Sequence, residues 1–188
     1  MTRATTSTIC SETFEIWQAI FLRQGNSRMS TARQKMILDT NVLSNLRREH
    51  PHPALVAWLA TVDPALVFTT VASVVEIESG IARAPRPDKA AQLANWLENL
   101  LELANVMVLD VPAARTLGRM QAHPAMTGFL VGPTGRRPIK LGIDLTIASI
   151  AITQHATVVT GDYDDFVRIA LHFPLIVFDP FGSRTHSP

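Results

Sequence analysis

Four acidic residues that lie far apart in the sequence stand beside apolar runs, where a strand ends or a helix begins. Asp39 follows the apolar run in MILDTNVL, and Asp162 follows the one in VVTGDYDDF. Glu76 in SVVEIESG and Asp144 in GIDLTIASIA stand at the starts of expected helices. If these carboxylates converge, they repel one another strongly unless protons or a cation neutralise them.

Carboxylate oxygens are hard ligands that suit Mg²⁺ or Mn²⁺, and these ions keep several waters when bound. A divalent ion held in this way can orient an attacking water and stabilise the charge that develops at a phosphodiester. Convergence of the four acids therefore favours the chemistry of a metal-dependent nuclease.

The chain from residue 36 onward alternates short apolar runs with stretches of helical period. The expected strands are rich in Val, Ile and Leu and cover residues 36–38, 66–69, 106–109, 157–160 and 175–178. The clearest expected helix covers residues 91–103, with Pro87 near its start. Continuous apolar strands separated by helices predict a three-layer α/β/α sandwich with a central parallel sheet. Ligands in such folds bind beyond the carboxyl ends of the strands, which places Asp39 and Asp162 at one edge.

Helix capping is an alternative explanation for the polar residues after the first strand. Asp39, Thr40 and Asn41 precede an expected helix over residues 42–48, and all three residue types accept hydrogen bonds from free helix amides. A helix needs one cap, so capping suits Thr40 or Asn41 and leaves Asp39 for a site.

The other acids have similar alternatives. Ser73 and Glu76 have the spacing of a capping box, and Asp144 suits the positive end of a helix dipole. The helix after Asp144 is apolar nearly all round, which places this acid near the core. Asp165 is expected to cap a helix over residues 166–171, whereas Asp162 is closer to the strand end and is the better site candidate.

Composition limits the remaining possibilities. The chain of 188 residues suits one domain, and its single Cys excludes an internal disulfide framework and suits a cytoplasmic protein. No run is long and apolar enough for a membrane span. The net charge of +1 indicates no bulk affinity for polyanions, so any nuclease activity must depend on a local site. One basic cluster, Arg136, Arg137 and Lys140, precedes Asp144 and is either a solvated loop or an RNA contact.

The two ends differ from the middle. Residues 1–35 are mostly polar, carry five basic residues against two Glu, and fit a signal peptide badly. They are expected to be an extension or a start-site overrun, poorly ordered apart from a short amphipathic helix, which is alternatively a partner-binding helix. The domain is expected over residues 36–181, followed by a tail over residues 182–188.

The order of the motifs LDTNVLSNL, SVVEIESGIAR, DLTIASIA, VVTGDYDDF and LIVFDPF resembles the PIN-domain family, and within it the VapC-type toxins of toxin–antitoxin pairs. The resemblance implies a cytoplasmic Mg²⁺- or Mn²⁺-dependent endoribonuclease that is commonly a homodimer and is inhibited by a cognate antitoxin. It implies that the metal is held by Asp39, Glu76, Asp144 and Asp162. By the same resemblance, Thr40 and Asn41 hold Asp39 by hydrogen bonds, and Asp165 supports the site from outside the metal shell.

The chain also departs from the family pattern. It has Thr160, Gly161 and Asp162 where relatives often have Thr-Arg-Asn, and Asp164 stands where they often have Arg. These changes should favour cations and weaken the approach of phosphate from that side. Two alternatives to a nuclease remain: a catalytically silent interaction domain of the same fold, and a metal-dependent phosphohydrolase of small phosphates.

Overall fold

One mixed sheet of six strands forms the centre of the protein. The computed structural model describes residues 34–130 and 142–188. The strand order is β3-β2-β1-β4-β5-β6, in which β1 to β5 are parallel and β6 is antiparallel to β5. The strand bounds are β1 Met36–Leu38, β2 Val67–Thr70, β3 Asn105–Met107, β4 Thr157–Val159, β5 Ile176–Asp179 and β6 Arg184–His186. The five expected strands are therefore confirmed, with bounds that shift by one or two residues.

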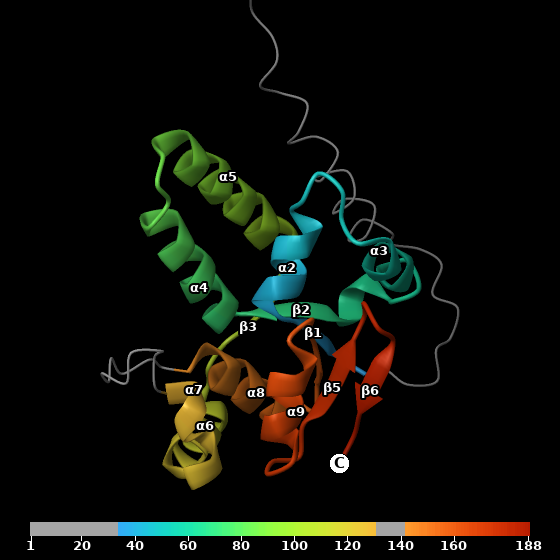
Figure 1. Cartoon of the computed structure of the whole chain (residues 1–188), viewed down its shortest axis with the longest axis vertical. Coiled ribbons are helices and arrows are strands. Elements are labelled where there is room, and N and C mark those ends of the chain that lie inside the picture. The colour runs from blue at the N-terminus through green and yellow to red at the C-terminus, as the bar shows by residue number, and fades with distance from the viewer. Residues whose placement is uncertain (1–33, 131–141) are drawn as a thin grey trace, which may run out of the picture.

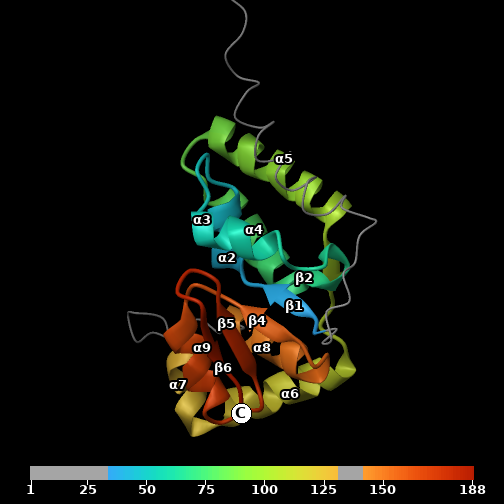
Figure 2. The ribbon, with the colours of Figure 1, turned by 90° about the vertical axis from the view of Figure 1, so that its right-hand side faces the viewer.

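Helices cover both faces of this sheet, which confirms the three-layer α/β/α architecture (Figures 1 and 2). One layer contains α2 Thr40–Leu46, α3 Pro53–Leu59, α4 Val71–Ala82 and α5 Pro87–Leu103. The other layer contains α6 Val111–Ala122, α7 Thr127–Leu130, α8 Ile143–Thr153 and α9 Tyr163–Ala170. The short 3-10 helices η1 Pro64–Leu66 and η2 Pro124–Met126 complete the described elements.

Each layer buries its own apolar cluster against the sheet. Leu43 and Leu46 of α2 pack with Leu97 and Leu100 of α5 on one face, as the helical period of α5 predicts. On the other face α8 is buried nearly all round, so it forms the centre of the second cluster. This position explains why a helix with so little polar surface is stable there.

Three helix starts differ from the sequence expectations. Asp39, and not Thr40 or Asn41, is the N-cap of α2, because the helix already begins at Thr40. The N-cap of α4 is Thr70, whose hydroxyl accepts from the Ser73 N–H, so the capping box of Ser73 and Glu76 is wrong. Both of those residues lie inside the helix.

The start of α9 also differs from its expectation. This helix begins at Tyr163 and not at residue 166, and Asp162 occupies the N-cap position. Asp165 is therefore in the first turn and does not cap the helix. Asp162 makes no side-chain capping bond either, so its carboxylate is left for other contacts.

Residues on both sides of the expected domain contact it. The stretch expected as a tail contains β6, which pairs with β5. Gln34 and Lys35, from the end of the expected extension, bond to His155 and Gln154. Residues 1–33 and the basic cluster Arg136, Arg137 and Lys140 lie outside the described residues. No helix within the described ranges is long and apolar enough to cross a membrane.

A buried carboxylate, Asp179, fixes the turn between β5 and β6. It accepts hydrogen bonds from the N–H groups of Phe181 and Gly182 and from both Nε and Nη2 of Arg184. Burial raises the pKa of Asp179, but the hydrogen bonds from Arg184 and the backbone outweigh it, so the pKa lies below its ordinary value. The turn places Phe181 against Gly161, at the carboxyl end of β4.

We expect Arg184→Gln to lower the free energy of unfolding at neutral pH, because it removes the cation that is paired with the carboxylate of Asp179. Because the folded-state pKa of Asp179 is lowered, this contribution is present above about pH 4 and is lost as the pH falls further. Denaturant unfolding at pH 7 and at pH 3 measures both effects.

Arg168→Gln is the matched control, because the ion pair of Arg168 with Asp165 is exposed on both sides and should contribute less than about 1 kcal/mol. Equal destabilisation by the two variants would contradict the special role of the Asp179 ion pair.

Candidate active site

Asp39 is buried at the carboxyl end of β1, with 4% of its surface exposed. Its N–H continues the sheet ladder by donating to the Val159 carbonyl at 3.0 Å. Its Oδ1 accepts from the Thr40 N–H at 2.7 Å, and its Oδ2 accepts from the Thr160 hydroxyl at 2.8 Å. The carboxylate is therefore fixed by the backbone of β1, the first turn of α2 and the end of β4.

The amide of Asn41 links Asp39 to the end of β4. Its Nδ2 lies within hydrogen-bond distance of Asp39 Oδ2 at 2.7 Å, Thr160 Oγ1 at 3.0 Å and Asp162 Oδ2 at 2.9 Å. Its Oδ1 accepts from the Gly161 N–H at 2.9 Å. One amide group thus connects two carboxylates that are 123 positions apart in the sequence, Asp39 and Asp162.

Thr40 and Asn41 were both expected to hold Asp39 by hydrogen bonds, and the side chain of Asn41 does so. Thr40 contributes only its backbone N–H, because its hydroxyl is buried without a hydrogen-bond partner among the described residues. Sequence reasoning did not assign a role to Thr160, whose fully buried hydroxyl donates to Asp39 and accepts from the Asp162 N–H. The sequence did indicate a role for Thr160, because it follows an apolar strand and stands two residues before Asp162.

Asp144 and Glu76 come to the site from two other helices. Asp144 is in the first turn of α8 and is half-buried, after Gly142, whose φ of 56° begins the helix from a left-handed conformation. Glu76 lies in the middle of α4 and is exposed. The negative charges of both residues disfavour ionisation of Asp39 and so raise its pKa.

The pKa of Asp39 is raised to about 7. Burial is the largest cause, and the negative charges of Asp144 and Glu76 add to it. Hydrogen bonds from Thr160 and from the Thr40 backbone act in the opposite direction and are outweighed. The structure therefore maintains an acid that is costly to ionise without a neighbouring positive charge.

The four expected acids are not preassembled into a metal cage. Among the described residues, no three Asp, Glu, His or Cys side chains are close enough together to hold an ion as they stand. The donor set nevertheless fits a divalent cation, because all three acids offer hard carboxylate oxygens and a cation would offset the cost of ionising the buried Asp39, to which the charges of Asp144 and Glu76 add. The exposed side chain of Glu76 can change rotamer without disturbing the core.

Two expected contributors have no contact with the site acids that the described part of the chain shows. Asp165 is exposed and pairs with Arg168 at 3.2 Å. The basic cluster proposed for RNA contact lies within residues 131–141, which the structure does not describe.

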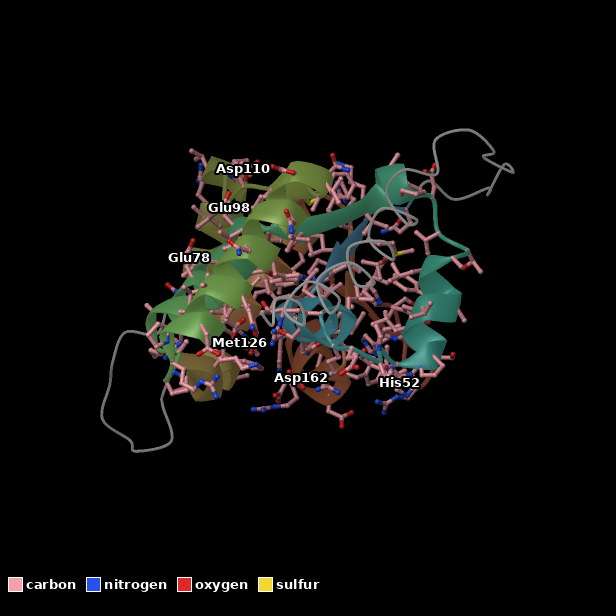
Figure 3. All side chains as sticks on the ribbon, turned by 90° about the horizontal axis from the view of Figure 1, so that it is seen from above. His52, Glu78, Glu98, Asp110, Met126 and Asp162 are labelled. Carbon is pink, nitrogen blue, oxygen red and sulfur yellow. The ribbon has the colours of Figure 1, made fainter. Side chains whose placement is uncertain are left out.

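Asp162 lies at the surface (Figure 3), and the Asn41 amide links it to the buried Asp39. In that view Asp162 and His52 lie along one edge of the molecule, whereas Glu78 and Glu98 mark α4 and α5 on another side. A ligand can therefore approach Asp162 from solvent, whereas Asp39 is almost completely buried.

The pattern of the PIN domain matches residues 36–171. The chain is 30% identical over 142 residues to a protein named Ribonuclease VapC5 from Mycobacterium tuberculosis, which covers 75% of this chain and 92% of that protein. It is 28% identical over 139 residues to the VapC ribonuclease Y4jK of Sinorhizobium fredii, covering 72% of this chain and 93% of that protein.

Solved structures show the same likeness. The crystal structure of FitAcB from Neisseria gonorrhoeae superposes with a TM-score of 0.61 at 26% identity, covering 78% of this chain and 98% of that chain. VapBC-5 from Mycobacterium tuberculosis, described as a member of the VapBC family of toxin–antitoxin systems, gives a TM-score of 0.50 at 27% identity, covering 77% and 98%. With its α/β/α fold and a buried acid at the end of β1, the chain belongs to the PIN domain family and is a VapC-type member of it.

Proposed function

We propose that this protein is a Mg²⁺- or Mn²⁺-dependent endoribonuclease that acts as the toxin of a toxin–antitoxin pair. The observation that carries the proposal is the environment of Asp39, a buried carboxylate whose pKa is raised by burial and by the charges of Asp144 and Glu76. Membership of the VapC-type PIN proteins supports RNA as the substrate, since the relatives above are named ribonucleases.

Asp39, Asp144 and Glu76 would hold the divalent ion, directly or through water. Such an ion supplies Lewis-acid stabilisation of charge at the phosphate and lowers the pKa of a bound water. Asp39 is the fixed member of the set, because hydrogen bonds hold both of its oxygens. Glu76 is exposed, so its side chain can adjust to the coordination that the ion requires.

Asp162 would orient the attacking water or complete a second ion site. Asn41 holds Asp162 Oδ2, and Oδ1 makes no recorded hydrogen bond among the described residues. In-line attack of water on phosphorus forms the new P–O bond as the bond to the ribose 3′ oxygen breaks, which leaves a 5′ phosphate and a 3′ hydroxyl.

A cognate antitoxin and a second copy of the chain are the proposed protein partners. The proposal of an antitoxin is supported by the likeness to VapBC-5, whose description places it in a toxin–antitoxin system. Large apolar side chains that are exposed on the described surface, among them Val108, Val111 and Leu171, are available to such contacts.

We expect Asp39→Asn and Asp144→Asn each to lower RNA cleavage by about 100-fold or more, because each removes a charged ligand and with it several kcal/mol of stabilisation. The assay uses purified protein, single-stranded RNA and added Mg²⁺ or Mn²⁺, with circular dichroism to confirm that the fold is intact. DNA of the same sequence and a chromogenic phosphate ester should be poor substrates.

Glu98→Gln is the control, because Glu98 is exposed on α5, away from Asp162 (Figure 3). It should leave cleavage unchanged. Full activity of both aspartate variants would reject the assigned site, and turnover of the phosphate ester in preference to RNA would identify a phosphohydrolase.

The raised pKa of Asp39 predicts a pH-dependent stability. The native state holds a proton on Asp39 up to about pH 7, whereas the unfolded state releases it near the ordinary value of 3.8. Stability should therefore fall as the pH rises from about 4 to 7, by up to about 4 kcal/mol, and Asp39→Asn should remove this dependence. Unfolding of both proteins from pH 4 to 8 without metal measures the difference.

Added Mg²⁺ should stabilise the wild type more at pH 8 than at pH 5, since binding requires the ionised carboxylate. Asp39→Asn should show little of this stabilisation. A wild type and variant with parallel pH profiles and equal responses to Mg²⁺ would contradict the assigned electrostatics of Asp39.

A further inference from the structure

An open pocket of about 300 Å³ adjoins Asp162. Its lining comes from α2 and the turn after it, the end of β4 and the turn after β5, and consists of Asn41, Asn45, Arg48, Gly161, Asp162 and Phe181. Asn41, Gly161 and Asp162 already belong to the active site described above. The other side chains extend the site away from the acids, on a scale that suits one nucleotide.

The polar lining from α2 is set by helical spacing. Asn41 and Asn45 are four residues apart and share one face of α2, which differs from the face that buries Val42 and Leu46. Arg48 follows on the turn that ends the helix, where its N–H donates to the Asn45 carbonyl at 3.0 Å. The amides of Asn41 and Asn45 and the guanidinium of Arg48 therefore line the pocket in this order along the chain.

Arg48 is the positive charge of this pocket, and its guanidinium forms no hydrogen bond or ion pair with any described residue. Other arginines near the active site are engaged: Arg184 is paired with Asp179, and Arg168 with Asp165. An unpaired arginine in an open pocket is available to bind a phosphate group.

The amide of Asn45 is oriented by the neighbouring loop. Its Oδ1 accepts from the His52 N–H at 2.8 Å, so the carbonyl is occupied. Its Nδ2 has no recorded acceptor among the described residues and is available as a hydrogen-bond donor to a ligand in the pocket.

Phe181 forms an aromatic wall of the pocket. The turn anchored by Asp179 holds it, His52 contacts its ring edge-on at 5.2 Å, and a Cβ on Gly161 would lie only 2.9 Å from its ring. The glycine therefore allows the ring to lie close to the active-site backbone. Aromatic rings in such positions stack on unpaired bases of single-stranded nucleic acid.

We propose that this pocket binds the ribonucleotide next to the scissile phosphate, in an inference that rests on the proposed function. Arg48 contacts a backbone phosphate, Asn45 donates to the sugar–phosphate backbone, and Phe181 stacks on the base. The pocket supplies positive charge on the solvent side of an acidic site, so the RNA backbone can be held while the scissile phosphate lies at the carboxylates.

The test measures binding of a short fluorescent single-stranded RNA to the full chain in EDTA, where cleavage is not required. Arg48→Ala should weaken binding about tenfold and reduce the slope of log Kd against log salt by about 0.7, the loss of one phosphate contact. Phe181→Leu should weaken binding about tenfold without changing that slope. Phe181→Tyr should bind RNA as tightly as the wild type, since the tyrosine ring can still stack.

Arg47→Ala is the matched control, because it removes the same charge from the neighbouring residue, whose guanidinium lies over the Trp96 ring at 6.0 Å. It should bind RNA like the wild type. Thermal unfolding of all the variants shows whether each keeps the fold.

Equal binding by the Arg48→Ala and Arg47→Ala proteins would overturn the pocket assignment, as would a wild type that binds no RNA. Metal-dependent cleavage of RNA by the wild type, measured alongside, separates the two proposals. If cleavage persists while Arg48→Ala changes neither Kd nor KM, the nuclease stands and the pocket has another role.

Discussion

The placement of Asp39 away from water is the constraint on which the rest of the site depends. A carboxylate at the end of a central strand loses its hydration, and Asp144 and Glu76 add negative charge to the same place. Hydrogen bonds from the Thr160 hydroxyl and the Thr40 backbone recover part of that cost but do not restore the ordinary pKa. The ionised form of Asp39 is therefore unfavourable without a neighbouring positive charge, which supports the proposed metal site.

The sheet order turns this constraint into a site. Because β4 lies beside β1, the turn after β4 meets the start of α2, and one asparagine amide can reach both Asp39 and Asp162. The turn after β5 adds Phe181 next to Gly161, since β5 is the following strand. The Asp179–Arg184 pair fixes that turn from outside. The order of the strands thus brings together the acids and the proposed substrate contacts. Helix α2 adds the polar side chains of Asn41 and Asn45.

The sequence predicted the parallel strands and the position of Asp39, because buried strands are continuous apolar runs and ligands gather at their carboxyl ends. It could not predict β6, whose residues Arg184–His186 have no apolar pattern and depend on the ion pair to Asp179. It misplaced the start of α4 because two hydroxyls compete to cap it, and only the buried position of Thr70 at the end of β2 selects one. The role of Asn41 required the adjacency of β1 and β4, which no local spacing encodes.

The central claim is that Asp39 and Asp144 share a divalent ion, although their side chains are not preassembled around one. The most direct measurement is a crystal structure of the protein grown with Mn²⁺, with anomalous scattering recorded at the manganese edge. The account predicts one or two anomalous peaks within coordination distance of Asp39 and Asp144, with Glu76 or Asp162 turned toward them. Peaks only at other positions, with Asp39 still hydrogen-bonded as a neutral acid, would contradict it.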